Sequence, residues 1–177
     1  MGWNISPSPG LESPFIHTAC QTDSYTAGYT CVRMCSASRT GRSGAAGYSG
    51  RADMTTSTLP PALDADAFDL DGPAGRVHVY AAPSGAGTPL LLVHSVNAAG
   101  NAREMRPAFE HFRGIRPVYA LDLPGFGLSD RSDRAYTPRL MTDAVASVAA
   151  EVRRRHGGAA IDLMALSLGC EFAARAV

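Results

Sequence analysis

The chain has 177 residues, of which 45% are hydrophobic and 18% charged, and its formal net charge at pH 7 is zero. This length suits one domain with a single core. Balanced charge creates no field that attracts nucleic acid or an anionic membrane surface, so we expect neither partner. No apolar run approaches the roughly 20 residues of a membrane-spanning helix, and no segment has the pattern of a signal peptide. We therefore expect a cytoplasmic protein.

Residues 1–58 differ in composition from the rest of the chain. They are rich in Ser, Thr, Gly and Ala with scattered Arg, and their apolar residues do not recur with a period of 2 or 3.6 residues. A segment without such a period has no face that could bury apolar area, so we predict a disordered leader. The alternative is a small folded subdomain around Trp3, Phe15 and Tyr25. Because the composition becomes ordinary near Met54, we hypothesise that translation starts there; an intact mass that includes earlier residues would exclude this.

Three of the four cysteines, Cys20, Cys31 and Cys35, lie in this leader, and the fourth is Cys170. No two of them have the C-x-x-C spacing of zinc or redox sites. Cys31 and Cys35 could pair or bind a metal together with His17, but we favour unpaired thiols in a reducing cytosol. We predict no cofactor and no metal.

The pattern of an α/β domain begins near Asp69, and we assign residues 69–177 to this domain. Its first strand covers residues 76–80, where apolar and polar side chains alternate: Val77 and Val79 on one face, His78 and Tyr80 on the other. Such alternation predicts a half-exposed strand near a sheet edge.

Three further strands are predicted, at residues 90–93, 118–123 and 160–166, and the first of them is a continuous apolar run. Runs of this kind are typical of strands in a parallel sheet that is covered on both faces. Between them, Pro107 begins a short helix, and Thr137 with Pro138 begins a longer one that ends near Gly157. Arginines 153–155 favour the end of that helix, so we interpret them as a helix terminus rather than a binding patch. Strands that alternate with helices predict a mostly parallel sheet with helices on both faces.

One segment has the residues of a catalytic site, and it joins the last predicted strand to the last predicted helix. Residues 165–169 read Ala-Leu-Ser-Leu-Gly. A sharp turn there lifts Ser167 above the sheet edge, where its hydroxyl can act as a nucleophile once a base takes its proton. Ala165 and Gly169 provide the small residues that the crowded turn needs. The alternative, a serine that caps a helix, does not explain these small flanking residues.

Three motifs together resemble the α/β-hydrolase family. Residues 165–169 look like its nucleophile elbow, G-x-S-x-G, with Ala165 in place of the first glycine. Residues 94–100 follow an apolar strand and look like its His-Gly oxyanion loop, with Ser95 in place of the glycine. Residues 122–130 are similar to its D-x-P-G-x-G-x-S segment. The motifs occur in the order of the family, and the resemblance covers residues 76–177.

The resemblance implies roles for individual residues. Ser167 is the nucleophile, and the backbone N–H groups of Val96 and Leu168 form the oxyanion hole. Asp122 organises the loop after its strand by accepting backbone hydrogen bonds, and His94 is structural. The implied function is a serine hydrolase that acts on an ester or related carbonyl compound as its small-molecule substrate.

The acid and the histidine of the family's triad come after the serine along the chain. The residues after Ser167 include no Asp and no His, and all five histidines precede it. We therefore expect a truncated α/β-hydrolase fold that is marginally stable and nearly inactive alone. We also expect the strand at 160–166 to form an exposed edge that favours self-association. The alternative function is a non-catalytic remnant or a partner-dependent binding module.

Overall fold

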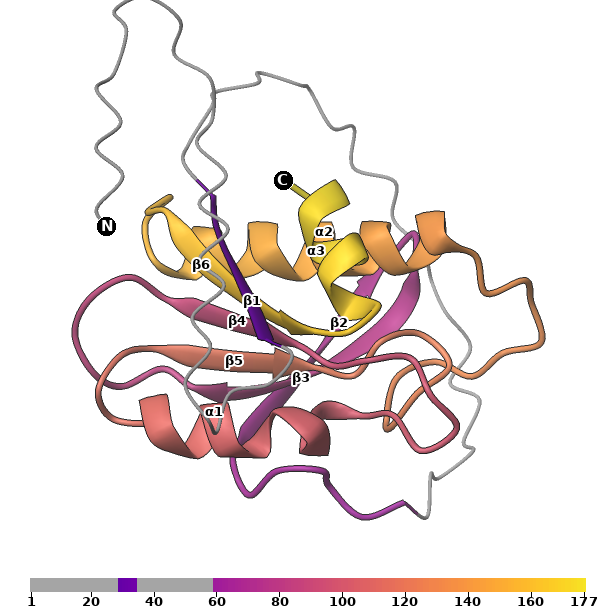
Figure 1. Ribbon diagram of the computed structural model, residues 1–177, viewed down its shortest axis with the longest axis horizontal. Helices are drawn as coiled ribbons and strands as arrows, with labels where there is room; N and C mark the ends of the chain where they lie inside the picture. Colours follow the sequence, from indigo (N-terminus) through magenta and orange to yellow (C-terminus); the bar gives the residue numbers. More distant parts are fainter. Residues whose placement is uncertain (1–28, 35–58) are drawn as a thin grey trace, which may run out of the picture.

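The computed structural model describes residues 29–34 and 59–177, which form an α/β structure around one mixed sheet (Figure 1). The strand order is β1-β6-β4-β5-β3-β2. The strands are β1 (Tyr29–Met34), β2 (Asp66–Gly72), β3 (Gly75–Ala82), β4 (Leu90–Val93), β5 (Val118–Leu121) and β6 (Ile161–Leu166). The helices are η1 (Ala102–Met105), α1 (Arg106–Phe112), α2 (Pro138–Arg155) and α3 (Gly169–Arg175). This architecture confirms the predicted fold class.

The three central strands are parallel and are covered on both faces. β4 is parallel to both β5 and β6, whereas β1, β2 and β3 pair antiparallel with their neighbours. Figure 1 shows α1 on one side of the sheet and α2 with α3 on the other. Within β4, Leu91 and Val93 belong to the cluster that contains α2, and Leu90 and Leu92 belong to the cluster that contains Phe109 of α1. The continuous apolar run is therefore explained by burial on both faces.

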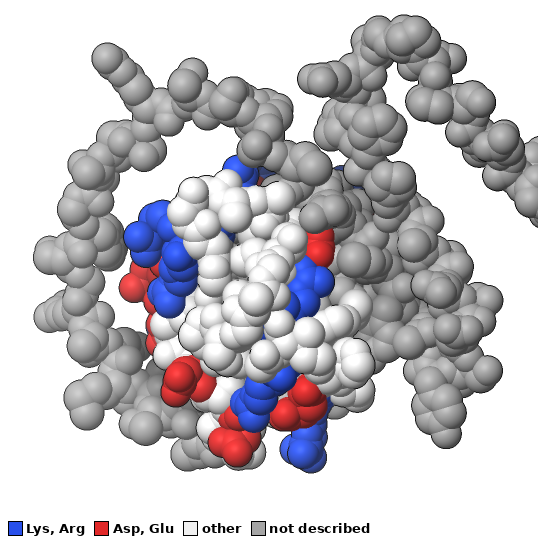
Figure 2. Space-filling model, turned by 90° about the vertical axis from the view of Figure 1, so that its left-hand side faces the viewer, with Lys and Arg blue, Asp and Glu red and all other residues white. Residues whose placement is uncertain are grey.

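Helix α2 has the start that the sequence predicts. The side chain of Thr137 accepts a hydrogen bond from the N–H of Leu140 at 3.2 Å, and Pro138 occupies the first turn. The residues that α2 buries lie at helical spacing: Met141, Ala144, Val145, Val148, Ala149 and Val152. At its end, Arg154 and Arg155 each form an ion pair with Glu151. Figure 2 likewise shows basic and acidic side chains next to one another on the face it displays.

The first predicted strand is less exposed than expected. Tyr80 of β3 is only 1% exposed, and its hydroxyl accepts a hydrogen bond from the N–H of Ala62 at 2.8 Å. The prediction of a half-exposed strand was wrong at Tyr80 because the segment before β2 contacts that face. The strand at this edge of the sheet is instead β2, which pairs with β3 in a hairpin and begins at Asp66.

The predicted exposed edge at residues 160–166 is also not found. β6 lies between β4 and β1, and β1 pairs with it antiparallel from Tyr29↔Leu166 to Met34↔Ile161. A strand within the leader thus takes the place that was expected to be open, and residues 29–34 differ from the predicted disorder. The remaining predictions for the leader, including the start at Met54, fall outside the described residues, and so does Cys35 of the Cys31–Cys35 pair considered above. None of the helices in the described part of the chain is long and apolar enough to cross a bilayer.

Candidate active site

The turn between β6 and α3 bends at Ser167. Its φ angle is +51°, and it is the one residue other than glycine with a positive φ among residues 59–177. A left-handed conformation at a residue with a Cβ atom costs about 1–3 kcal/mol and is concentrated at functional sites. Ser167 is exposed, although β6 before it and α3 after it both contribute to the core. The turn therefore presents the hydroxyl-bearing residue at the surface.

The elbow backbone lies against the end of β4. A Cβ atom at Gly169 would be 2.4 Å from the carbonyl oxygen of His94 and 3.2 Å from that of Val93. On the other flank, Ala165 is 1% exposed and its carbonyl accepts a hydrogen bond from the Cys170 thiol at 3.3 Å. Position 169 thus has no room for a side chain, and its absence lets the elbow contact the loop after β4, while Ala165 is buried beneath the turn.

His94 links the ends of β4 and β5 through both ring nitrogens. The N–H of Leu123 donates to Nε2 at 2.9 Å, and Nδ1 lies 2.6 Å from the carbonyl oxygen of Ser95. Because Nε2 accepts, the proton resides on Nδ1 and is donated to Ser95. Burial lowers the pKa of His94, opposed by the hydrogen bond to Ser95 and by the charges of Asp122 and Glu104. His94 is therefore a neutral structural group, and neither nitrogen is free to take a proton from Ser167.

The contact of His94 with Ser95 also sets the direction of the Val96 N–H. The carbonyl of Ser95 and the N–H of Val96 belong to one peptide unit, which is planar and trans, so the two groups point in opposite directions. Among the described residues, no acceptor meets the N–H of Val96 or of Leu168. Val96 is 37% exposed and Leu168 is 43% exposed. The two loops in contact at Gly169 thus both carry backbone N–H groups without an acceptor among the described residues, and those of Val96 and Leu168 are among them.

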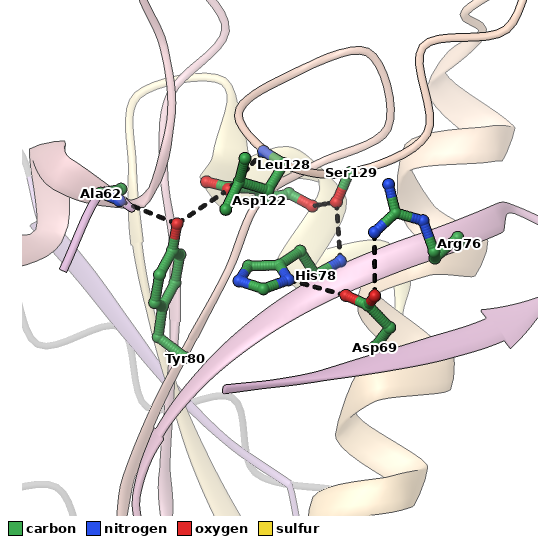
Figure 3. Close-up of polar contacts among 8 residues, drawn as sticks. All are labelled: Ala62, Asp69, Arg76, His78, Tyr80, Asp122, Leu128 and Ser129. Carbon is green, nitrogen blue, oxygen red and sulfur yellow. Dashed lines mark hydrogen bonds and ion pairs between the residues drawn. The ribbon is translucent and has the colours of Figure 1, made fainter. Parts of the chain in front are cut away.

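Asp122 organises the loop after β5, as Figure 3 shows in part. Its buried carboxylate accepts hydrogen bonds from the N–H groups of Ala102 at 2.8 Å and Leu128 at 2.9 Å. The Tyr80 hydroxyl donates to Oδ2 at 3.4 Å, and burial together with the nearby Asp122 charge raises the pKa of Tyr80 to about 12, against the effect of the hydrogen bond from Ala62. The Ser129 hydroxyl binds the Asp122 carbonyl. All these contacts fit the organising role expected for Asp122.

A contact between a histidine and an aspartate in the β2–β3 hairpin was not predicted from the sequence. His78 and Asp69 are direct partners in the β2–β3 hairpin, with Nδ1 2.7 Å from Oδ1, and Arg76 joins Asp69 at 2.9 Å (Figure 3). The signal that could have revealed it is the Gly-Pro-Ala-Gly turn at residues 72–75, which fixes the hairpin register. In the sheet, β5 and β4 separate this pair from β6.

Ser167 has no base at hydrogen-bond distance within the described part of the chain. His78 contacts Asp69, His94 contacts Ser95 and Leu123, and His156 contacts the Tyr119 hydroxyl at 2.9 Å. His111 lies on α1, which packs on the face of the sheet opposite α3. Residues 59–177 also contain no group of three or more potential metal ligands.

No protein-family model and no curated protein matches the chain. Solved structures do, and these neighbours are α/β-hydrolase fold proteins, the family that the three motifs resemble. The N-formylmaleamic acid deformylase of Pseudomonas putida S16 is 26% identical, with a TM-score of 0.43, over 49% of this chain and 33% of that one. An α/β-hydrolase fold protein from Burkholderia ambifaria is 21% identical, with a TM-score of 0.43, over 49% and 30%. A thermophilic esterase from Thermogutta terrifontis is 23% identical, with a TM-score of 0.40, over 50% and 32%. The matched part thus spans about a third of each solved chain.

Proposed function

We propose that the chain is part of a serine hydrolase of the α/β-hydrolase family, with Ser167 as the nucleophile. Its hydroxyl oxygen attacks the carbonyl carbon of an ester or related small-molecule substrate, and the carbonyl oxygen becomes an oxyanion. The N–H groups of Val96 and Leu168 donate hydrogen bonds to that oxygen. A base outside the described contacts takes the hydroxyl proton, the alcohol leaves, and water then releases the acyl group.

The observation that carries this proposal is the left-handed, exposed backbone of Ser167 between β6 and α3. A glycine could adopt this conformation without strain, so a serine there costs stability without improving the packing. A strained serine at a strand-to-helix turn is the arrangement in which the hydroxyl acts as a nucleophile. Ser167 therefore lowers the stability of the fold at the position where the reaction requires a nucleophile.

The N–H groups of Val96 and Leu168, which have no acceptor among the described residues, support the same reaction. A backbone N–H next to the surface can bind water, but these two lie on loops that meet beside Ser167. Donors that are fixed before the reaction stabilise developing negative charge, and removal of one such donor costs roughly 10²–10³ in rate. Val96 and Leu168 are therefore proposed as the oxyanion donors.

The second candidate function is a non-catalytic remnant or a partner-dependent binding module. The observation in its favour is that none of the described histidines contacts Ser167. Without a base, a serine hydroxyl is a weak nucleophile. The two functions differ in whether Ser167 reacts when a base is supplied.

A fluorophosphonate probe with added imidazole separates the two functions. Fluorophosphonates phosphonylate activated serines, and imidazole supplies the base from solution. We expect labelling at Ser167, increasing with imidazole concentration and absent in Ser167→Ala, with the site mapped by peptide mass spectrometry. A folded sample that stays unlabelled at every imidazole concentration would support the binding module instead.

A further inference from the structure

One carboxylate holds the loop that follows β4. Oε2 of Glu104 accepts hydrogen bonds from both the N–H of Ser95 at 2.9 Å and the Ser95 hydroxyl at 2.7 Å. The side-chain amide of Asn97 donates to the Ser95 oxygen at 2.7 Å and to the other oxygen of Glu104. The amide oxygen of Asn97 accepts from the N–H of Ala99 at 2.9 Å. We name Ser95, Asn97 and Glu104 the loop clamp.

The loop clamp is anchored in the core. Glu104 belongs to η1, whose Ala102 and Met105 are fully buried, and the N–H of Ala102 donates to the buried Asp122. Ser95 is only 7% exposed. Burial acts to raise the pKa of Glu104, but the hydrogen bonds from Ser95 and Asn97 outweigh it and lower that pKa below its usual value. The carboxylate therefore stays ionised at neutral pH, and a charged acceptor makes hydrogen bonds about twice as strong as a neutral one.

The clamp fixes every polar group of Ser95. Its N–H and hydroxyl bind Glu104, and its carbonyl binds His94. The next N–H along the chain is that of Val96, which has no acceptor among the described residues. Because the Ser95–Val96 peptide is planar, a fixed Ser95 also fixes the direction of the Val96 N–H. Ser95 has no positive φ, so the position does not require glycine.

We propose that Glu104 is a positioning residue, which acts through Ser95 and Asn97 to hold the Val96 N–H in the direction of the oxyanion. The inference rests on the proposed function, since it assigns a purpose to the loop only if Ser167 attacks a carbonyl there. It goes beyond that function by assigning the geometry of one oxyanion donor to a carboxylate on a different element. Ser95, which replaces the glycine of the resembled motif, provides the hydroxyl that the carboxylate binds.

The test uses a Ser167→Cys variant of the full chain, because a thiolate needs no base to react. Two reagents are compared. In p-nitrophenyl acetate, the sulfur attacks the carbonyl carbon, p-nitrophenolate leaves and an oxyanion forms on the way. With iodoacetamide, the sulfur displaces iodide from a methylene carbon and no oxyanion forms. Peptide mass spectrometry at residue 167 gives each rate without interference from the other cysteines, and the ratio of the two rates reports the oxyanion donors.

In this background we expect Glu104→Gln to lower the acylation rate about tenfold while the alkylation rate stays within about twofold. A loosened donor should lose part of the roughly 10²–10³ that a deleted donor costs. Asn97→Ala, at an exposed position that cannot unfold the core, should lower the same ratio to a smaller extent. The matched control is Glu110→Gln, which removes an exposed carboxylate from α1 and should leave both rates unchanged.

The outcomes separate the two proposals. If Glu104→Gln and Asn97→Ala leave the ratio of acylation to alkylation unchanged, Glu104 is not a positioning residue, and the proposed function is unaffected. If the Ser167→Cys chain shows no higher ratio than a Ser84→Cys chain, whose thiol lies in an exposed loop, the proposed function fails. Hydrogen exchange of the Ser95 amide, which donates to Glu104, then decides the clamp, because unchanged exchange in Glu104→Gln would overturn it.

Discussion

The loops after β5 and β6 both begin at the carboxyl end of the parallel strands, but they differ in whether their backbone N–H groups have hydrogen-bond acceptors. After β5, the buried Asp122 collects the N–H groups of Ala102 and Leu128, so the loop is held by a side chain. After β6, no side chain of the described residues binds the N–H of Leu168; the bend packs closely against the end of β4 at Gly169, and Ser167 bears backbone strain. The first loop satisfies its donors, and the second leaves a donor free for a ligand.

Removal of the Asp122 carboxylate should have the largest effect. Asp122→Ala leaves two backbone N–H groups and the Tyr80 hydroxyl without their acceptor in the interior. Each unsatisfied buried group costs about 1–3 kcal/mol, so we expect a loss of about 3 kcal/mol or more in the free energy of unfolding. Urea denaturation measures it. Asp133→Ala, at an exposed position in the same loop, should stay within about 0.5 kcal/mol of the parent. Equal effects of the two variants would refute the role assigned to Asp122.

A methyl group at the elbow should have the next largest effect. In Gly169→Ala the new Cβ atom would lie 2.4 Å from the His94 carbonyl, so the two backbones must move apart. Overpacking of this kind costs about 1–3 kcal/mol. Gly72→Ala is the matched control, because its Cβ atom would meet only the Ser147 hydroxyl, at 4.0 Å. If thermal unfolding shows the two variants to be equally stable, the elbow does not pack against β4 as described.

Relief of the strain at Ser167 should stabilise the chain. Glycine adopts a positive φ without a steric penalty, whereas alanine keeps the strain and lacks the hydroxyl. We expect Ser167→Gly to be about 1 kcal/mol more stable than Ser167→Ala, measured by urea denaturation. A Ser167→Gly chain that is less stable than Ser167→Ala would mean that residue 167 is not left-handed in solution.

His94, which links the ends of β4 and β5, should make the stability of the fold depend on pH. The pKa of His94 is lowered by burial, so the unfolded chain takes up a proton at a higher pH than the folded chain. Stability is therefore fully present above the ordinary histidine pKa and falls as the pH drops below it toward the pKa of the folded state. His94→Gln should flatten this dependence of the urea midpoint between about pH 7.5 and 5.5. His111→Gln, an exposed histidine on α1, should leave the slope as it was.

Local sequence patterns were sufficient to predict the central strands, the start of α2 and the position of the turn at Ser167. Each depends on neighbouring residues: an apolar run, a Thr-Pro pair, or small residues on both sides of a serine. The burial of Tyr80 and the pairing of β1 with β6 were not predicted, because they depend on contacts between segments far apart in the chain. No periodicity within one segment carries that information.

The loop clamp was missed for a different reason. Asn101 and Glu104 have the spacing of a helix capping box, in which the glutamate binds the backbone of the capping residue. Asn101 does cap η1, since its side chain accepts from the N–H of Arg103, but Glu104 turns to Ser95 and Asn97 instead. The same spacing permits both arrangements, and only the position of the loop after β4 decides between them.

The most direct test of the nucleophile and its two donors is a crystal structure of the chain after phosphonylation in the presence of imidazole. We predict a bond from phosphorus to Oγ of Ser167, with the phosphonyl oxygen about 2.7–3.1 Å from the backbone nitrogens of Val96 and Leu168. A phosphonyl oxygen that faces solvent, with both N–H groups bound elsewhere, would contradict the oxyanion site. A label on any other residue would contradict the nucleophile.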